Sequence, residues 1–253
     1  GTAMASLAML RQVFLDASLA ESGAMRRSAD ASFGELGPAI FLANGRREIE
    51  NFLDLRAEFA PDLPAMILGG RYAMYFVDRL KEQNVSVLYV AGFGEAPKSD
   101  EDLELEALEE RPYWQEPAQL RVAARDQHVI NVSEYAALLD AGVSCALVPG
   151  NSTSSWKDAW EQLADAGMSP DEIWAAASAD VAELLQLEHV GNVAAGSAAD
   201  FVIYSGEVDA EAKPLWVFAD GRGWEYTYED EAEDEEGGEG ESSGAEGGNP
   251  KLD

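Results

Sequence analysis

The amino-acid sequence predicts an α/β protein built around a parallel β-sheet, and three observations support this fold class. Between residues 38 and 150, short apolar runs alternate with amphipathic helical segments, which is typical of βαβ units. The apolar runs show no alternation with polar residues, as expected for strands covered on both faces. Near the C-terminal end, Phe201–Tyr204 and Pro214–Ala219 flank an acidic turn and predict a β-hairpin.

The strands and helices of the βα region follow from these runs in order. Residues 3–20 have good helix formers and apolar residues near helical spacing, so they are expected to form the first helix. Strands are expected at 38–43, 65–70, 85–93 and 144–150, and helices at 46–60, 72–83 and 132–143. Residues 21–37 are expected to be a loop, and residues 94–127 are expected to be irregular apart from a helix after Ser99 or Asp100. Four βα units are half the number in an eight-stranded barrel.

Two further helices are expected between the last strand of the sheet and the hairpin. The segment 155–167 is the first of them. The second runs over 169–187, with Ser169 as N-cap, Pro170 in the first turn and Glu172 completing a capping box. From residue 225 onward the chain is mainly Glu, Asp, Gly and Ser, which predicts a disordered acidic tail. The expected domains are therefore 1–189, 190–224 and 225–253.

The charge of the chain restricts its partners. Forty-eight acidic residues against 17 basic ones give a net charge of −31. A field of this sign repels nucleic acid and anionic membranes, so neither is expected as a partner. Only five of the basic residues are lysine, and an acidic, lysine-poor surface suits high salt. We therefore expect a halophilic or marine source, the alternative being a very acidic mesophilic protein.

No apolar stretch approaches the roughly 20 residues that a membrane helix needs. The N-terminal residues also lack the basic start and cleavage site of a secretory signal.

Few residues of the chain are suited to catalysis. Cys145 lies in the apolar run "CALV" and is expected to be a buried, inert thiol. The two histidines, His128 and His189, are expected to have surface or helix-capping roles, because they lack the spacing of metal ligands. "GGRYA" (69–73) precedes a helix N-terminus; either an anion site or a simple βα turn fits, and the turn is favoured.

The segment "GMSPDEIWAAASADVAELLQLEHVGNVAAGSAADFVIYSGE" (167–207) resembles the C-terminal signature of the amidohydrolase superfamily. Upstream, "GPAIFLANGRREIENFLDLRAEF", "AMILGGRYAMYFVDRLKEQNVSVLYV" and "EYAALLDAGVSCALVPGN" resemble the fifth, sixth and final βα units of its imidazolonepropionase-like branch. The resemblance covers residues 3 to about 224. It implies the C-terminal half of a (β/α)8 barrel, plus a C-terminal hairpin belonging to a small composite β-sandwich built from both chain ends.

The resemblance also implies partners and a compartment. Strands missing from this chain would have to come from a complementary N-terminal amidohydrolase-like half or from self-association. Relatives of this branch are often exported, which implies a periplasmic or extracellular location.

Members of that superfamily use zinc or another divalent metal, and the matching positions here do not retain its ligands. The fifth-strand histidine aligns near Leu42, the sixth-strand histidine near Leu68 or Gly69, and the final aspartate near Pro149, Gly150 or Asn151. Leucine and glycine have no side-chain ligand atom, and asparagine is a weak neutral ligand for such a metal. We therefore expect no metal, no cofactor and no catalytic residue in this chain.

Polar residues after the predicted strands are the candidates for binding a substrate. These residues are Asn44, Arg46, Arg71 and Asn151, and the arginines would suit a carboxylate in the cleft. Three functions remain open. The first is a degenerate half-barrel, inactive alone, that acts structurally or completes a larger assembly. The second is a subunit of a hydrolase of C–N bonds whose metal another chain supplies, and the third is an acidic binding module.

Overall fold

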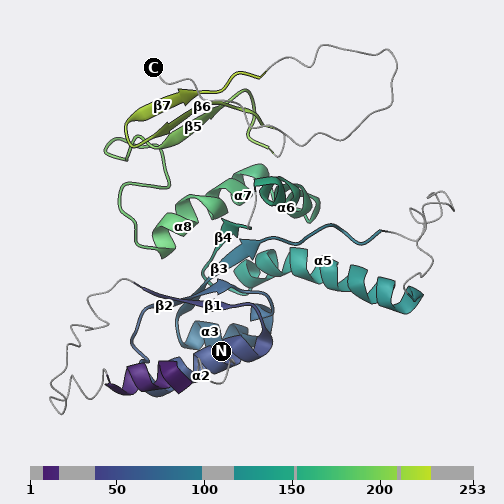
Figure 1. Ribbon diagram of the computed structural model, residues 1–253, viewed down its shortest axis with the longest axis vertical. Coiled ribbons are helices and arrows are strands. Elements are labelled where there is room, and N and C mark those ends of the chain that lie inside the picture. The colour runs from purple at the N-terminus through teal and green to yellow at the C-terminus, as the bar shows by residue number, and fades with distance from the viewer. Residues whose placement is uncertain (1–7, 17–37, 99–116, 151–152, 210–211, 229–253) are drawn as a thin grey trace. The chain divides into compact units, whose positions relative to one another are not determined.

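The computed structural model describes residues 8–16, 38–98, 117–150, 153–209 and 212–228 (Figure 1). The chain divides into two compact units, Gly1–Leu187 and Glu188–Asp253. Several expected features lie outside the described residues: the loop 21–37, the helix after Ser99 or Asp100, Asn151, most of the acidic tail, and both ends of the helix expected over 3–20. None of the described helices combines the length and the apolar composition needed to cross a membrane.

The first unit contains a four-stranded parallel sheet, as expected. Its strands are β1 (Ala39–Ala43), β2 (Ala65–Gly69), β3 (Val85–Ala91) and β4 (Cys145–Pro149), adjacent in that order. The register aligns Leu42 with Leu68 and Leu68 with Leu88, so these side chains point to one face of the sheet. Because all strands run the same way, their carboxyl ends lie at one edge.

One face of the sheet is covered by the helices that follow the strands. These helices are α2 (Arg46–Phe59), η1 (Ala73–Phe76) with α3 (Val77–Glu82), and α5 (Ala118–Asp140). On β1, Phe41 packs against Phe52 of α2, with ring centroids 4.3 Å apart. On β3, Tyr89 packs against Tyr135 of α5 at 5.9 Å. A helix over residues 8–16 adds Phe14 to the cluster of Leu55 and Leu63 at this side.

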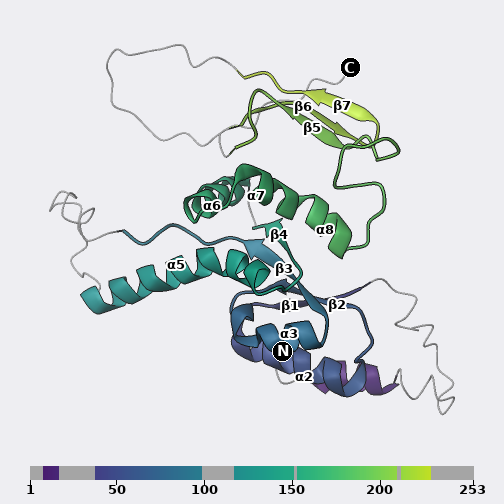
Figure 2. The same cartoon turned by 180° about the vertical axis from the view of Figure 1, so that it is seen from behind.

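The opposite face is only partly covered. After β4 the chain forms α6 (Thr153–Asp165), α7 (Pro170–Ala177) and α8 (Ala179–Leu184). Three residues of α8 and its end, Val181, Leu184 and Leu185, pack on the sheet residues Met66, Leu88 and Ala146. In both views the sheet lies between α2 and α3 on one side and α8 on the other (Figures 1 and 2). On β1, however, Ile40 and Leu42 are 48% and 71% exposed.

Three expectations for the helices were wrong. Helix α5 begins at Ala118, although residues up to 127 were expected to be irregular, so His128 lies within a helix. The first half of α5 carries exposed apolar residues with no consistent face, among them Leu120, Val129 and Ile130, and therefore gives no periodic signal. The single helix expected over 169–187 is broken at Ser178, whose hydroxyl donates to the Trp174 carbonyl at 2.6 Å. The helix expected over 72–83 begins as a 3-10 turn.

The helix ends follow the expected capping chemistry. Ser169 Oγ accepts from the N–H of Glu172, and the Glu172 carboxylate accepts from the N–H of Ser169, so the capping box is confirmed. Helix α5 ends at Asp140, and Gly142 follows its C-cap Ala141 with a φ of +77°, which suits glycine. The Gly142 N–H donates to Leu139 and the Val143 N–H to Leu138, which is a Schellman motif.

The second unit contains a three-stranded antiparallel sheet rather than the expected hairpin. Its strands are β5 (Phe201–Tyr204), β6 (Pro214–Ala219) and β7 (Arg222–Glu225). Asp220 and Gly221 both have positive φ and form the two-residue turn between β6 and β7, so the Asp-Gly pair leads from the second strand into a third.

The start of the expected tail, at residues 225–228, belongs to this sheet. Glu225 is the last residue of β7. The Tyr226 N–H donates to Leu215 at 2.9 Å, and the Tyr228 hydroxyl donates to Pro214 at 3.0 Å. The prediction of disorder was therefore wrong for 225–228, because two tyrosines supply hydrogen bonds there. Residues 229–253 lie outside the described part.

Candidate functional site

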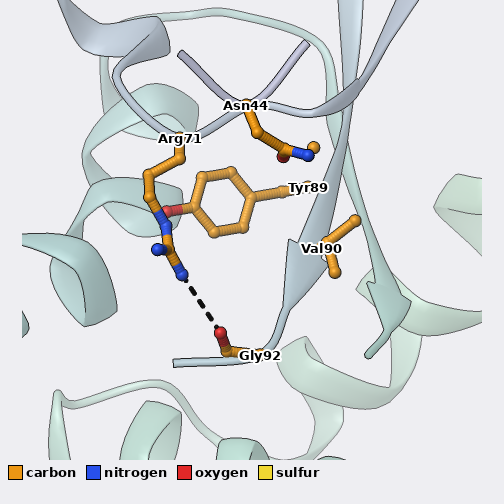
Figure 3. A pocket seen from close by; sticks show the side chains of 6 residues that line it. Asn44, Arg71, Tyr89, Val90 and Gly92 are labelled. Carbon is orange, nitrogen blue, oxygen red and sulfur yellow. Dashed lines mark hydrogen bonds between the residues drawn. The ribbon is translucent and has the colours of Figure 1, made fainter. Parts of the chain in front are cut away.

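A cavity of about 300 Å³ lies at the carboxyl edge of the parallel sheet. Residues from β2, β3 and the segments that follow β1, β2 and β3 line it: Asn44, Gly69, Arg71, Tyr89, Val90 and Gly92. Figure 3 shows the Arg71 and Asn44 side chains near the Tyr89 ring. In parallel α/β sheets, ligands bind at this edge, because loops from several strands converge there.

The turn after β2 shapes one wall of the cavity. Gly69 and Gly70 have φ of +119° and +78°, and Tyr72 follows at +73°. A Cβ at Gly69 would overlap the Asn44 side-chain oxygen and lie 2.9 Å from the Ala43 carbonyl. Glycine at this position therefore permits both the turn and the close approach of Asn44.

Arg71 places a positive charge in the cavity. Its Nη2 donates to the Gly92 carbonyl at 3.2 Å, which ties the turn after β2 to the end of β3 (Figure 3). A guanidinium has five N–H donors, so further donors remain for a ligand in addition to this bond. The planar arrangement of those donors suits a carboxylate.

A buried carboxylate supports this turn from the helix side. Glu134 of α5 is 5% exposed, and its oxygens accept the N–H groups of Tyr72 at 3.1 Å and Met74 at 3.2 Å. The Tyr89 hydroxyl lies 3.1 Å from the same carboxylate and 3.0 Å from the Asn131 carbonyl. Burial first, and then the charge of Glu134, raise the pKa of Tyr89, so its phenol stays neutral.

These contacts also decide between the two interpretations of "GGRYA". The segment is a βα turn, and the N–H groups of Tyr72 and Met74 at its helix start bind an internal carboxylate. Glu134 thus occupies the place that an external anion would take.

The structure brings two of the four candidate binding residues together. Asn44 and Arg71 line the same cavity. The guanidinium of Arg46 instead lies over the Tyr75 ring, 4.1 Å from its centroid, and does not line the cavity. Asn151 lies outside the described residues.

Sequence reasoning missed Tyr89 and Glu134. Tyr89 was assigned only to an apolar strand, although a tyrosine near the carboxyl end of such a strand can reach the edge of the sheet. Glu134 lies four positions before the buried Leu138, so helical spacing places it on the buried face. An acidic residue on the buried face of a helix is rare unless it has a partner, and this could have identified Glu134 from the sequence.

The residues at the strand ends do not fit a divalent metal. Leu42 and Leu68 are register partners on neighbouring strands and point to the same face, and neither offers a ligand atom. β4 ends at Pro149. Among the residues that the structure describes, no three His, Cys, Asp or Glu side chains lie close enough together to hold a metal ion.

No family model matches the chain, and no curated protein matches its sequence. Solved structures do match the fold. An amidohydrolase from Thermotoga maritima MSB8 superposes with a TM-score of 0.63 at 18% identity, over 87% of this chain. A second amidohydrolase gives 0.54 at 17% identity over 79%, and an Xaa-Pro dipeptidase with bound methionine in its active site gives 0.52 at 18% over 78%.

These likenesses show the fold alone: part of the chain folds like the matched amidohydrolase structures. The chain covers 55% of the Thermotoga protein and 47% of each of the other two, so it spans about half the length of the structures it matches.

Proposed function

We propose that this chain is an amidohydrolase-like subunit that has lost the metal chemistry of the superfamily and retains a carboxylate-binding pocket. The proposal rests mainly on one observation: the carboxyl edge of the sheet lacks metal ligands but has polar side chains that can bind an anion. Leucines stand at the paired strand positions 42 and 68, whereas Arg71 and Asn44 line a cavity beside them. Such an edge can hold an anionic ligand, but its residues supply no activated water.

The exposed apolar face supports a half-barrel. Parallel sheets are almost always covered on both faces, because their strands are apolar throughout. Here Ile40 and Leu42 remain exposed on the face opposite α2 and α5. In the described part of the chain, β1 and β4 are the edges of the sheet. Further strands, from a complementary segment or from a second copy, would cover this face and pair with these edges.

The second unit supports a composite sandwich in the same way. In its described residues no apolar side chain is fully buried, although β5 and β6 carry Phe201, Trp216 and Phe218. A three-stranded sheet needs a second layer to shield such a face. We infer that strands supplied with the complementary half of the barrel form that layer.

A carboxylate is the favoured ligand for the cavity. Arg71 is held in place by the Gly92 carbonyl and by the turn that Glu134 fixes, so its remaining donors are pre-organised. One structural neighbour is an Xaa-Pro dipeptidase with methionine bound in its active site, and an amino acid carries such a carboxylate.

Ligand binding to the intact chain tests the pocket. We expect L-methionine to produce saturable NMR shifts at Gly69, Val90 and Gly92, and methionine amide, which lacks the carboxylate, to bind far more weakly. Arg71→Ala should weaken binding by about 10-fold or more, since a charged hydrogen bond contributes about 1.5–3 kcal/mol. The control is Arg47→Ala, which removes an equal charge from the exposed side of α2 and should leave binding unchanged. Equal binding of acid and amide would refute the carboxylate assignment.

Two further measurements test the degenerate-subunit proposal. We expect association with itself or with a complementary segment, measured by light scattering, and no stoichiometric zinc on this chain by elemental analysis. Stoichiometric metal together with hydrolysis of a dipeptide by the assembled protein would favour the alternative, a working hydrolase with its metal held by another chain. A stable monomer with no partner would contradict the half-barrel proposal.

A further inference from the structure

The sequence contains three triplets of the N-glycosylation type, Asn-x-Ser or Asn-x-Thr with x other than proline. They begin at Asn84, Asn131 and Asn151. The chain has seven asparagines, and 21 of its 253 residues are serine or threonine, so composition alone predicts fewer such triplets. An asparagine in such a triplet can carry a glycan only where it lies at the surface of the folded protein. The structure therefore decides which of the triplets can be used.

Asn131 is unsuited to modification. It lies within α5, where its side-chain oxygen accepts the Gln127 amide at 3.0 Å. The hydroxyl of Ser133, the third residue of this triplet, donates to the Val129 carbonyl at 2.8 Å. Both side chains that a transferase must recognise are thus bonded within the helix. Asn151 lies outside the described residues.

Asn84 has the surroundings of an acceptor. It is exposed and lies in the turn between α3 and β3, with a φ of +50°. Its backbone N–H donates to the Lys81 carbonyl at 3.1 Å, which fixes the turn. In the described part of the chain, no hydrogen bond holds its side-chain amide. The amide nitrogen is therefore open to solvent on a turn of defined conformation.

Ser86 is the residue that the turn alone does not explain. Asparagine is favoured at positive φ, so the turn geometry by itself accounts for Asn84. Ser86, however, interrupts the apolar and aromatic sequence of β3, VSVLYVA. It is half-buried opposite Met66 of β2, and no hydrogen bond of its hydroxyl occurs within the described residues. A hydroxyl two positions after the asparagine is what the triplet requires, so modification accounts for both residues.

We propose that Asn84 carries an N-linked glycan and that the chain is exported. The co-substrate is an oligosaccharide held on a polyprenyl phosphate or diphosphate, and a membrane-bound transferase of the cell joins the two. The Asn84 side-chain nitrogen forms a bond to C1 of the first sugar, and the bond from C1 to the phosphate oxygen breaks. The polyprenyl phosphate leaves with the electron pair, and the nitrogen loses one proton to a base of the transferase.

The position of Asn84 keeps a glycan away from the other proposed contacts of the protein. Asn84 precedes the first residue of β3, whereas the Arg71 cavity lies at the carboxyl edge, about 20 Å away along the strand. Strand β3 is bonded on both sides, to β2 and β4, so the glycan does not lie on an outer strand of the sheet. The inference therefore does not depend on carboxylate binding at Arg71 or on how the sheet is completed.

Mass spectrometry of the chain purified from the cells that naturally make it tests the proposal. After proteolysis, we expect a glycan mass on the peptide that contains Asn84 and none on Asn131. Ser86→Ala and Asn84→Gln, produced in the same cells, should each remove the glycan mass. The matched control is Ser133→Ala, which breaks the triplet at Asn131 and should leave the glycan on Asn84 unchanged.

Ser86→Ala separates a loss of modification from a loss of folding, because it keeps Asn84 and its turn. Asn84→Gln places a less suitable residue at a φ of +50°, so its thermal midpoint is expected to be lower. An unmodified Asn84 in the natural protein, or a glycan that persists on Asn84 in Ser86→Ala, would overturn the inference. Neither result bears on the binding of a carboxylate at Arg71, so the two proposals fail separately.

Discussion

The carboxylate of Glu134 accepts the backbone N–H of Tyr72 at 3.1 Å across 62 positions of sequence, and this bond joins α5 to the turn that presents Arg71. The same carboxylate accepts the Met74 N–H, so one buried side chain fixes both sides of the start of η1. The position of the arginine in the cavity thus depends on a glutamate that does not line it.

Replacing this carboxylate should destabilise the fold. Glu134→Gln puts an amide NH2 opposite backbone N–H groups, and we expect a loss of about 1–3 kcal/mol in the free energy of unfolding, measured by urea titration. Glu161→Gln on the exposed side of α6 should change it by less than about 0.5 kcal/mol. An unchanged urea midpoint for Glu134→Gln would show that the carboxylate does not hold the turn.

The turn itself should tolerate no side chain at residue 69. In Gly69→Ala the new methyl would meet Asn44 and the Ala43 carbonyl at a φ of +119°, so we expect a loss of more than about 1 kcal/mol and weaker carboxylate binding. Gly45→Ala is the matched control, because Gly45 has an extended φ of −137° and room for a methyl. Because Gly45 is the N-cap of α2 and glycine is preferred to alanine there, this control should cost about 0.5–1 kcal/mol, less than Gly69→Ala. Equal effects of the two substitutions would rule out the steric argument.

Stability should fall in alkaline solution partly because of Cys145. Burial raises the pKa of its thiol from 9.0 to about 12, so between these values the folded chain binds more protons than the unfolded chain. Stability is therefore complete below pH 9 and decreases as pH rises, by up to about 1.4 kcal/mol per unit. We expect the urea midpoint of Cys145→Ala to fall less between pH 9 and 10 than that of the wild type. This range lies below the ordinary pKa of tyrosine. A decline as steep as in the wild type would point to other groups.

The native thiol should also resist alkylation at neutral pH, because the thiolate is the reactive form. Iodoacetamide labelling followed by mass spectrometry should modify Cys145 only after urea unfolding. Rapid labelling of the folded chain would contradict the burial of this side chain.

Salt should stabilise the chain. With a net charge of −31, self-repulsion is screened as the Debye length falls from about 10 Å at 0.1 M to about 3 Å at 1 M. We expect the thermal midpoint to rise by several degrees with KCl, about 2–4 °C for each kcal/mol. Removing residues 229–253, with eleven acidic residues and one lysine, should reduce this response without loss of folding. A midpoint independent of salt would refute the prediction of halophily.

Much of the first unit could be predicted from local patterns. The strands at Ala65–Gly69 and Val85–Ala91 stand out because a parallel strand buried on both faces must be apolar almost throughout. The capping box at Ser169 is equally local, since three residues determine it. By contrast, the start of α5 at Ala118 could not be predicted, because an exposed helix with no apolar face resembles a charged loop in composition.

The candidate site likewise has a part that the sequence could predict and a part that it could not. The sequence alone indicated that Asn44 and Arg71 follow strand ends and that Leu42 and Leu68 offer no metal ligand, because strand position and side-chain chemistry are local properties. Only the tertiary structure decided that Asn44 and Arg71 share one cavity while Arg46 stacks on Tyr75, and that Glu134 and Tyr89 stand behind them. Contacts between residues distant in the chain depend on how the helices pack on the sheet, and that packing cannot be derived from any single segment.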